Sequence, residues 1–212
     1  EQGELVSIMG ASGSGKSTLL NILGILDDYD SGSYYLAGRL IKGLSETQAA
    51  AARNNMIGYI FQSFNLISYK NAVENVALPL YYQGVARRKR NALALEYLDM
   101  LGLRDWAEHM PNEMSGGQKQ RVAIARMLTK KTPVMVFDDS LSAVDTQTDE
   151  HIREALNRDL TGTTSIIISH RITTLMDCDN ILVLERGKVL QLGTPQALLQ
   201  QDGLFRQIYD MQ

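Results

Sequence analysis

The chain has 212 residues, of which 44% are hydrophobic and 21% charged, and its formal net charge is −3. This is a globular composition, and the length suits one sizeable core or two closely joined lobes. The acidic balance argues against a general nucleic-acid surface, so the basic cluster 87–90 is interpreted as a solvated helix start. Cys178 is the only cysteine, which excludes an internal disulfide framework and indicates a reducing compartment. No apolar run approaches the ~18 residues that span a membrane, and no signal peptide is visible.

Alternating apolar runs and helical patterns predict a mostly parallel α/β sheet. Four short apolar runs are typical of buried strands: 5–9, 57–61, 134–137 and 165–168. Apolar residues recur with helical spacing in six stretches: 16–23, 45–53, 71–83, 87–101, 118–128 and 147–160. Between 63 and about 128 the strand signal vanishes, which indicates a helical insertion between two strands of the sheet.

Shorter signals complete the expected elements. Residues 33–36 and 38–41 are predicted to form a small antiparallel pair, and Ser45 is a candidate helix cap. Arg186-Gly187 lies between two apolar runs, 181–185 and 188–192, and predicts a hairpin. The chain ends in two expected short helices, 196–201 and 204–211.

The stretch Gly10–Ser17 has the form of a phosphate-binding loop, G-x-x-x-x-G-K-[ST], between an expected strand and an expected helix. Glycines let the backbone turn its N–H groups inward around phosphate oxygens, and the helix dipole favours the same anion. Lys16 would reach the β- and γ-phosphates, and the Ser17 hydroxyl would hold Mg²⁺. The expected nucleotide-binding residues are Gly10, Ser12, Gly13, Ser14, Gly15, Lys16, Ser17 and Thr18.

Polar residues follow three other strands at the edge where this loop is expected. Asp138 ends one strand and is a candidate Mg²⁺ ligand; alternatively it is a turn or helix-capping residue. Gln62, Asp139 and His170 suggest a metal or water contact, a catalytic base and a γ-phosphate contact respectively. Taken alone, each of these residues is a weak signal, and His170 by itself fits a structural hydrogen-bonding histidine better.

A second anion site is indicated by Ser115-Gly116-Gly117-Gln118, which opens a helix. One domain needs two such sites if it forms a two-fold dimer, in which the second site of each subunit covers the nucleotide bound by the other. The alternative is a glycine turn with a serine cap.

In order and spacing, these motifs resemble those of ABC-transporter ATPase domains. The resemblance makes 10–17 the Walker A loop, Gln62 the Q-loop, 114–118 the signature, 137–139 Walker B, Asp145 part of the D-loop and His170 the H-loop. It implies an α/β fold with a RecA-like P-loop core, a small antiparallel β lobe and an inserted helical lobe. The implied division of the single domain, 1–212, is 1–62 and 129–212 for the core with its β lobe, and 63–128 for the helical lobe.

Three features depart from the family pattern. Asp139 stands where the family usually has Glu, and its carboxylate falls more than ~1 Å short, an offset that can cost ~10²-fold in rate. The chain begins after the position of the adenine-stacking aromatic, so it is expected to be an N-terminally truncated piece or to bind nucleotide less tightly. Up to about 128 it resembles lipoprotein-releasing and macrolide-exporter ATPases, but from about 133 multidrug-exporter ATPases. A chimera with a mismatched packing seam near 129–133 is one explanation, and an unfamiliar natural branch is the other.

The resemblance implies an ATP-hydrolysing domain that takes ATP and Mg²⁺ and closes as a homo- or heterodimer. It would drive a transmembrane partner through the helical lobe around 62–82 from a cytoplasmic position, peripheral to the inner face of the membrane, without nucleic acid. The alternative reading is a degenerate, non-catalytic module that clamps ATP. A third, a soluble relative acting in DNA repair or on ribosomes, lacks support because no long linker or tandem domain is present in the chain.

Overall fold

The computed structural model describes residues 2–60, 64–138, 162–169 and 171–211. The predicted site residues Gln62, Asp139, Asp145 and His170 lie outside this part of the chain, as does the predicted helix 147–160.

The centre of the molecule is a six-stranded sheet in the order β4-β5-β6-β1-β7-β8. The first five strands in this order are parallel and β8 is antiparallel to β7. Their bounds are β1 Leu5–Met9, β4 Ile57–Ile60, β5 Val134–Phe137, β6 Thr164–Ile168, β7 Asn180–Glu185 and β8 Lys188–Gly193. The expected mostly parallel α/β sheet is therefore confirmed.

The strands are apolar on both sides because helices cover both faces of the sheet. Successive side chains of a strand point to opposite faces, so Ile8 packs with one core cluster and Met9 with the other. The cluster around Ile8 includes residues of α1 (Lys16–Leu23) and α2 (Glu46–Met56). The cluster around Met9 includes residues of six helices: α3 (Ala72–Tyr82), α4 (Arg87–Met100), α5 (Gly116–Leu128), α7 (Ile172–Met176), α8 (Pro195–Leu199) and α9 (Leu204–Met211).

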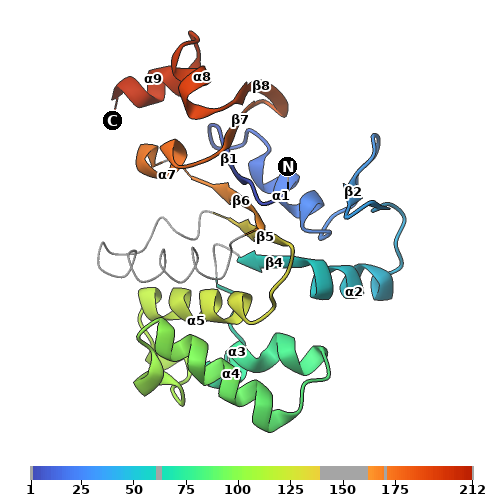
Figure 1. Cartoon of the computed structure of the whole chain (residues 1–212), viewed down its shortest axis with the longest axis vertical. Coiled ribbons are helices and arrows are strands. Elements are labelled where there is room, and N and C mark those ends of the chain that lie inside the picture. Colours follow the sequence, from blue (N-terminus) through green and yellow to red (C-terminus); the bar gives the residue numbers. More distant parts are fainter. Residues whose placement is uncertain (1, 61–63, 139–161, 170, 212) are drawn as a thin grey trace.

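Two smaller parts extend this core. Strands β2 (Tyr35–Leu36) and β3 (Arg39–Leu40) form a separate antiparallel pair, whose Leu36 packs into the cluster around Ile8. The helical lobe consists of α3 (Ala72–Tyr82), α4 (Arg87–Met100), two 3₁₀ turns at Arg104–Trp106 and Pro111–Glu113, and α5. Figure 1 shows α5 between the sheet and the pair α3–α4.

The junction at 129–133 joins α5 to β5 and is filled by side chains. Thr129, Thr132 and Met135 are buried, and Thr132 Oγ1 donates to the Val134 carbonyl oxygen at 3.1 Å. A Cβ on Gly58 of β4 would lie 2.3 Å from Met135 Sδ, so the two strands are in close contact there. Among the described residues the junction is therefore in close contact with β4 and β5, and a cleft of about 660 Å³ opens on its other side, between Thr129 and Lys131 and residues of α4.

Candidate nucleotide-binding site

The register of the sheet brings the candidate residues to one edge. Ile8 of β1 lies opposite Ile168 of β6. Ile167 lies opposite Phe137 of β5, which in turn lies opposite Ile60 of β4. Because these strands are parallel, the residues that follow them emerge together at their carboxyl ends. The loop after β1 and Asp138 after β5 therefore share an edge, with β6 between their strands.

The loop after β1 has a backbone that glycine alone adopts without strain. Gly10, Gly13 and Gly15 have φ angles of 151°, 75° and 100°. A Cβ on Gly10 would lie 2.2 Å from the Leu184 carbonyl oxygen of β7 and 2.7 Å from Ser14 Oγ. Glycine at position 10 is therefore required both by its φ angle and by the close approach of β7.

The loop presents cationic and hydrogen-bonding groups to an anion. Lys16 Nζ donates to the carbonyl oxygens of Gly10 and Ala11, at 2.8 Å each, so the ammonium lies against the loop. Ser14 is 4% exposed, and its hydroxyl has no hydrogen-bond partner among the described residues. Helix α1 has neither a side-chain cap nor an acidic residue in its first turn. Its first N–H groups and positive dipole end are thus not matched by a carboxylate of that turn.

The turn between β7 and β8 supports the loop from the side. Gly187 N donates to the Ser14 carbonyl oxygen at 3.0 Å, and Ser14 N donates to Ala11 O at 3.1 Å. A Cβ on Gly15 would lie 3.6 Å from the Cα atom of Gly187. The sequence predicts this hairpin but not its contact with the loop, since the two segments are more than 160 residues apart in the chain.

Asp138 is the described carboxylate that emerges beside the loop. Its backbone N–H donates to the Ile60 carbonyl oxygen at 3.0 Å, which continues the pairing of β5 with β4. The Asp138 carboxylate also affects Tyr59. The pKa of this phenol is raised mainly by burial and further by the negative charge of Asp138. One carboxylate with a serine hydroxyl such as that of Ser17 fits Mg²⁺, which is held by few protein oxygens together with phosphates. No cluster of three acidic, histidine or cysteine residues is found in the described chain.

The motif at 115–118 begins α5 with a reciprocal cap. Ser115 N donates to Gln118 Oε1 at 2.8 Å, and Gln118 N donates to Ser115 Oγ at 3.2 Å. Gly116 and Gly117 have nothing within 4 Å of a hypothetical Cβ, so they face open space. The serine cap of the simpler interpretation is present, and the open glycines also leave the helix start accessible to an anion.

Arg126, further along α5, holds the segment that follows Gln62, and the sequence analysis missed it. Its guanidinium donates to the carbonyl oxygens of Phe64 and Asn65, at 2.8 Å each. These two residues have φ angles of 59° and 44°, a left-handed conformation that is strained for a phenylalanine. The arginine therefore holds a strained backbone in place, and burial lowers its pKa.

Asn75 on α3 fixes the next part of the same segment. It is fully buried, accepts from Ile67 N at 2.8 Å and donates to the carbonyl oxygens of Ile67 and Lys70. A buried polar side chain is retained without penalty only when its hydrogen bonds are satisfied. A single asparagine in an apolar helix was the available signal, but sequence does not reveal its partners.

Comparison with known proteins supplies the context for this geometry. Residues 1–142 match the family model described as "ABC transporter". The uncharacterized ABC transporter ATP-binding protein YknY of Bacillus subtilis (strain 168) is 46% identical over 199 residues, which cover 92% of this chain and 85% of that protein. The match with this one relative therefore continues across 129–133.

Longer proteins and solved structures match as well. The macrolide export ATP-binding/permease protein MacB of Chlorobaculum tepidum is 41% identical over 191 residues, 89% of this chain. The chain spans only 29% of the length of that relative. The dimeric post-hydrolysis structure of the ATP-binding cassette MJ0796 with ADP and Pi superimposes with a TM-score of 0.85. It is 39% identical and covers 92% of this chain and 86% of its own.

Proposed function

This chain belongs to the ABC transporter family as an ATP-binding domain, and from that membership we propose how its residues bind and hydrolyse ATP. The phosphate loop carries the proposal, because its glycine backbone, the inward Lys16 and the helix start converge on one place. The β- and γ-phosphates would lie there, with the loop N–H groups as donors. Lys16 would exchange its bonds to loop carbonyls for bonds to phosphate oxygens.

The hydroxyl of Ser17 and the carboxylate of Asp138 are proposed to hold Mg²⁺, together with Gln62. When bound, the ion would neutralise charge that develops on the phosphates. Asp139 is proposed to orient or deprotonate the attacking water, and His170 to contact the γ-phosphate. An aspartate there is one methylene shorter than glutamate, so we expect slow turnover with normal binding.

Closure is proposed to require a second ATP-binding domain. The open start of α5, with Ser115, Gly116, Gly117 and Gln118, would cover the phosphates bound by the partner domain. Asp145 would lie near the same interface. The relative MJ0796 forms a dimer in its solved structure, which supports the same arrangement here.

A transmembrane partner is proposed to dock between the core and the helical lobe. A cleft of about 340 Å³ lies between the end of α1, β4, α3 and α5. Its lining includes Leu26, Tyr59, Asn65, Leu78, Pro79 and Met127. Arg126 and Asn65 connect this cleft to the start of the segment after Gln62, so a docked helix would sense changes there. None of the described helices is both long and apolar enough to cross a bilayer, and we propose a membrane-peripheral position through such a partner.

The deciding experiment compares the ATPase rate and nucleotide affinity of the parent with those of Asp139→Glu. We expect the glutamate to raise kcat and to leave the ATP dissociation constant unchanged, because binding depends mainly on the phosphate loop. A parent as fast as Asp139→Glu would contradict the slow-turnover proposal. ATP binding with no turnover in either protein would instead favour a module that clamps ATP.

A further inference from the structure

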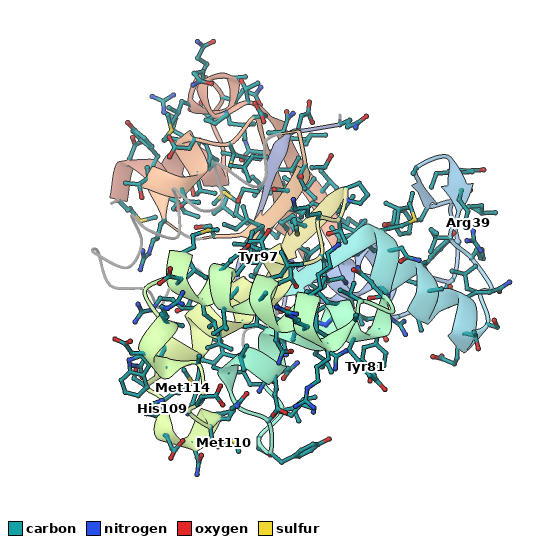
Figure 2. All side chains as sticks on the ribbon, turned by 60° about the horizontal axis from the view of Figure 1, so that its bottom comes forward. Arg39, Tyr81, Tyr97, His109, Met110 and Met114 are labelled. Atoms are coloured by element: carbon teal, nitrogen blue, oxygen red, sulfur yellow. The ribbon has the colours of Figure 1, made fainter. Side chains whose placement is uncertain are left out.

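An exposed patch of tyrosines and cations lies where α3 ends and α4 begins. We call it the tyrosine–arginine patch, and it consists of Tyr81, Tyr82, Arg87, Arg88, Lys89 and Arg90. Tyr81 and Tyr82 are 57% and 70% exposed, although aromatic side chains of this size usually bury much of their surface. In Figure 2, Tyr81 lies at the outer edge of the helical lobe.

The charge of this patch opposes the helix that carries it. All four residues of the first turn of α4 are cationic, and its N-cap is Ala86, which supplies no side-chain cap. The N-terminal end of a helix is the positive end of its dipole, so cations there are unfavourable. The residues four positions later are Asn91, Ala92, Leu93 and Ala94, none of which is acidic. A helix start with unfavourable charges, and with no acidic neighbour to offset them, is expected where those charges serve a function.

Contacts within the patch order part of it and leave the rest open. Arg90 Nη1 donates to the Val85 carbonyl oxygen at 3.1 Å, and its guanidinium lies 5.1 Å from the Tyr81 ring centroid. The rings of Tyr81 and Tyr82 meet edge to face at 5.4 Å. Arg87, Arg88 and Lys89 are exposed and form no ion pair with any described residue. Arg90 thus joins the paired rings to the first turn of α4, and the other three cations of that turn are exposed.

The patch is remote from the proposed dimer contact. Helix α3 begins next to the 3₁₀ turns before the signature, where Ala72 N donates to the His109 carbonyl oxygen at 3.0 Å. It runs for 11 residues, about 16 Å, to Tyr82. Figure 2 places Tyr81 and Met114 at opposite sides of the lobe. Leu78 and Pro79, one turn before the tyrosines, line the cleft proposed for the transmembrane partner, so the patch lies beside that partner and outside the dimer.

We propose that the tyrosine–arginine patch binds the anionic phospholipid surface next to the transmembrane partner. Exposed tyrosines suit the membrane interface, where an apolar ring and a polar hydroxyl are both accommodated. Lys and Arg near an anionic leaflet are attracted to it, and helices with such residues lie on that surface. The proposal rests on the membrane-peripheral position proposed above.

The observations favour a lipid surface over a nucleic acid. The four cations of the tyrosine–arginine patch lie in one helix turn of a chain whose net charge is −3. Nucleic-acid binding instead uses a basic stripe that extends along one face of a domain. The two tyrosines contact each other edge to face, so they are not spaced as separate platforms for successive bases. A compact patch of this kind can contact the flat surface of a bilayer, but it is too short to follow the backbone of a nucleic-acid strand.

The test measures co-sedimentation of the chain with phosphatidylcholine vesicles that contain or lack phosphatidylglycerol. Binding is expected with the anionic vesicles, and it should weaken as salt is raised. The triple variant Arg87→Gln/Arg88→Gln/Lys89→Gln should bind about 100-fold more weakly, because each cation at an anionic surface contributes about five-fold. Arg90 is kept because it contacts Val85 and Tyr81. The matched control, Arg39→Gln/Arg104→Gln/Arg206→Gln, removes three exposed cations elsewhere and should bind like the parent.

A second measurement locates the contact. Tyr82→Trp should show a blue-shifted tryptophan emission on anionic vesicles, whereas Tyr35→Trp, at a tyrosine that is 62% exposed on β2, should not. Equal binding by the parent and the patch triple, or an unshifted emission at 82, overturns the proposal. Tighter binding to single-stranded RNA, without competition by vesicles, also overturns it. ATP titration of the patch triple should match the parent, so failure of the lipid contact is distinguishable from failure of the ATP site.

Discussion

Arg126 donates a hydrogen bond of 2.8 Å to the carbonyl oxygen of Phe64 and thereby ties the signature helix to the segment after Gln62. A second bond of 2.8 Å reaches Asn65. Both acceptor residues have a left-handed backbone. Since the start of α5 is proposed to face the partner's ATP and Asn65 lines the cleft proposed for the transmembrane partner, this arginine is placed to connect the two.

Arg126→Met should lower the free energy of unfolding by roughly 2–4 kcal/mol, because it removes two hydrogen bonds from a charged donor. Denaturant unfolding measures this loss. Arg121→Met is the matched control, since Arg121 lies on the same helix and donates one bond of 3.2 Å to Leu101. ATP binding should survive in both variants, whereas ATP-dependent dimerisation, measured by light scattering, should weaken only in Arg126→Met. Equal stability of the two variants would contradict the anchoring role.

Lys16→Ala should weaken ATP binding by about 100-fold or more, since a charged hydrogen bond contributes about 1.5–3 kcal/mol and this ammonium would face several phosphate charges. Isothermal titration with MgATP measures the dissociation constant. Lys131→Ala serves as the control, because Lys131 is an exposed lysine after α5. An unchanged affinity in Lys16→Ala would remove the assignment of the phosphate loop.

Gly10→Ala should both destabilise the fold and impair ATP binding. Its Cβ would lie 2.2 Å from the Leu184 carbonyl oxygen, so the loop or β7 must move. Gly13→Ala is the control, because φ is positive there as well but nothing lies within 4 Å of the added Cβ. The control should lose about 1–2 kcal/mol from its left-handed backbone, and Gly10→Ala should lose more. Similar losses in urea unfolding would show that the contact with β7 is unimportant.

Lys130 should make stability depend on pH. Its Nζ donates to the carbonyl oxygens of Arg53 and Ile57, at 3.0 and 2.6 Å, and burial together with Arg126 lowers its pKa from 10.5 to about 8. Between these values the unfolded chain binds more protons than the folded one, so this lysine adds stability as pH rises from about 8 to about 10.5. Below about pH 8 the Lys130 amine is protonated in both the folded and the unfolded chain. The free energy of unfolding is then lowered by the full cost of burying its charge.

The contribution of Lys130 is isolated by comparison with Lys130→Met across this pH range. Cys178 acts in the opposite direction, because burial and the neighbouring Asp177 and Asp179 raise its pKa to about 12. Its folded thiol keeps a proton that the unfolded thiol loses above about pH 9. Because Cys178 is present in both proteins, its contribution cancels when the free energies of unfolding of the parent and Lys130→Met are subtracted. A difference that does not change with pH would show that the Lys130 ammonium is well solvated.

The local sequence determined the strands that follow from short apolar runs and the helix start that follows from a capping residue. Strands such as Leu5–Met9 and Val134–Phe137 have the predicted bounds, because an apolar run of four or five residues is too short for a buried helix and is typical of a buried strand. Helix α2 begins after the predicted cap Ser45, which exchanges hydrogen bonds with Gln48. The five-residue helix α7 was missed because it is too short to show a helical period.

Membership in the family was also predictable from the sequence, because the order and spacing of the motifs carry it. The glycine pattern of the phosphate loop was predictable because a φ angle is a property of one residue and its neighbours. Contacts between distant segments were decided only by the tertiary structure. Examples are Gly187 against Ser14, Arg126 on Phe64, and Leu184 beside Gly10. The physical reason is that a hydrogen bond or a close approach depends on where two segments are placed by strand order and helix packing, and neither segment alone carries that information.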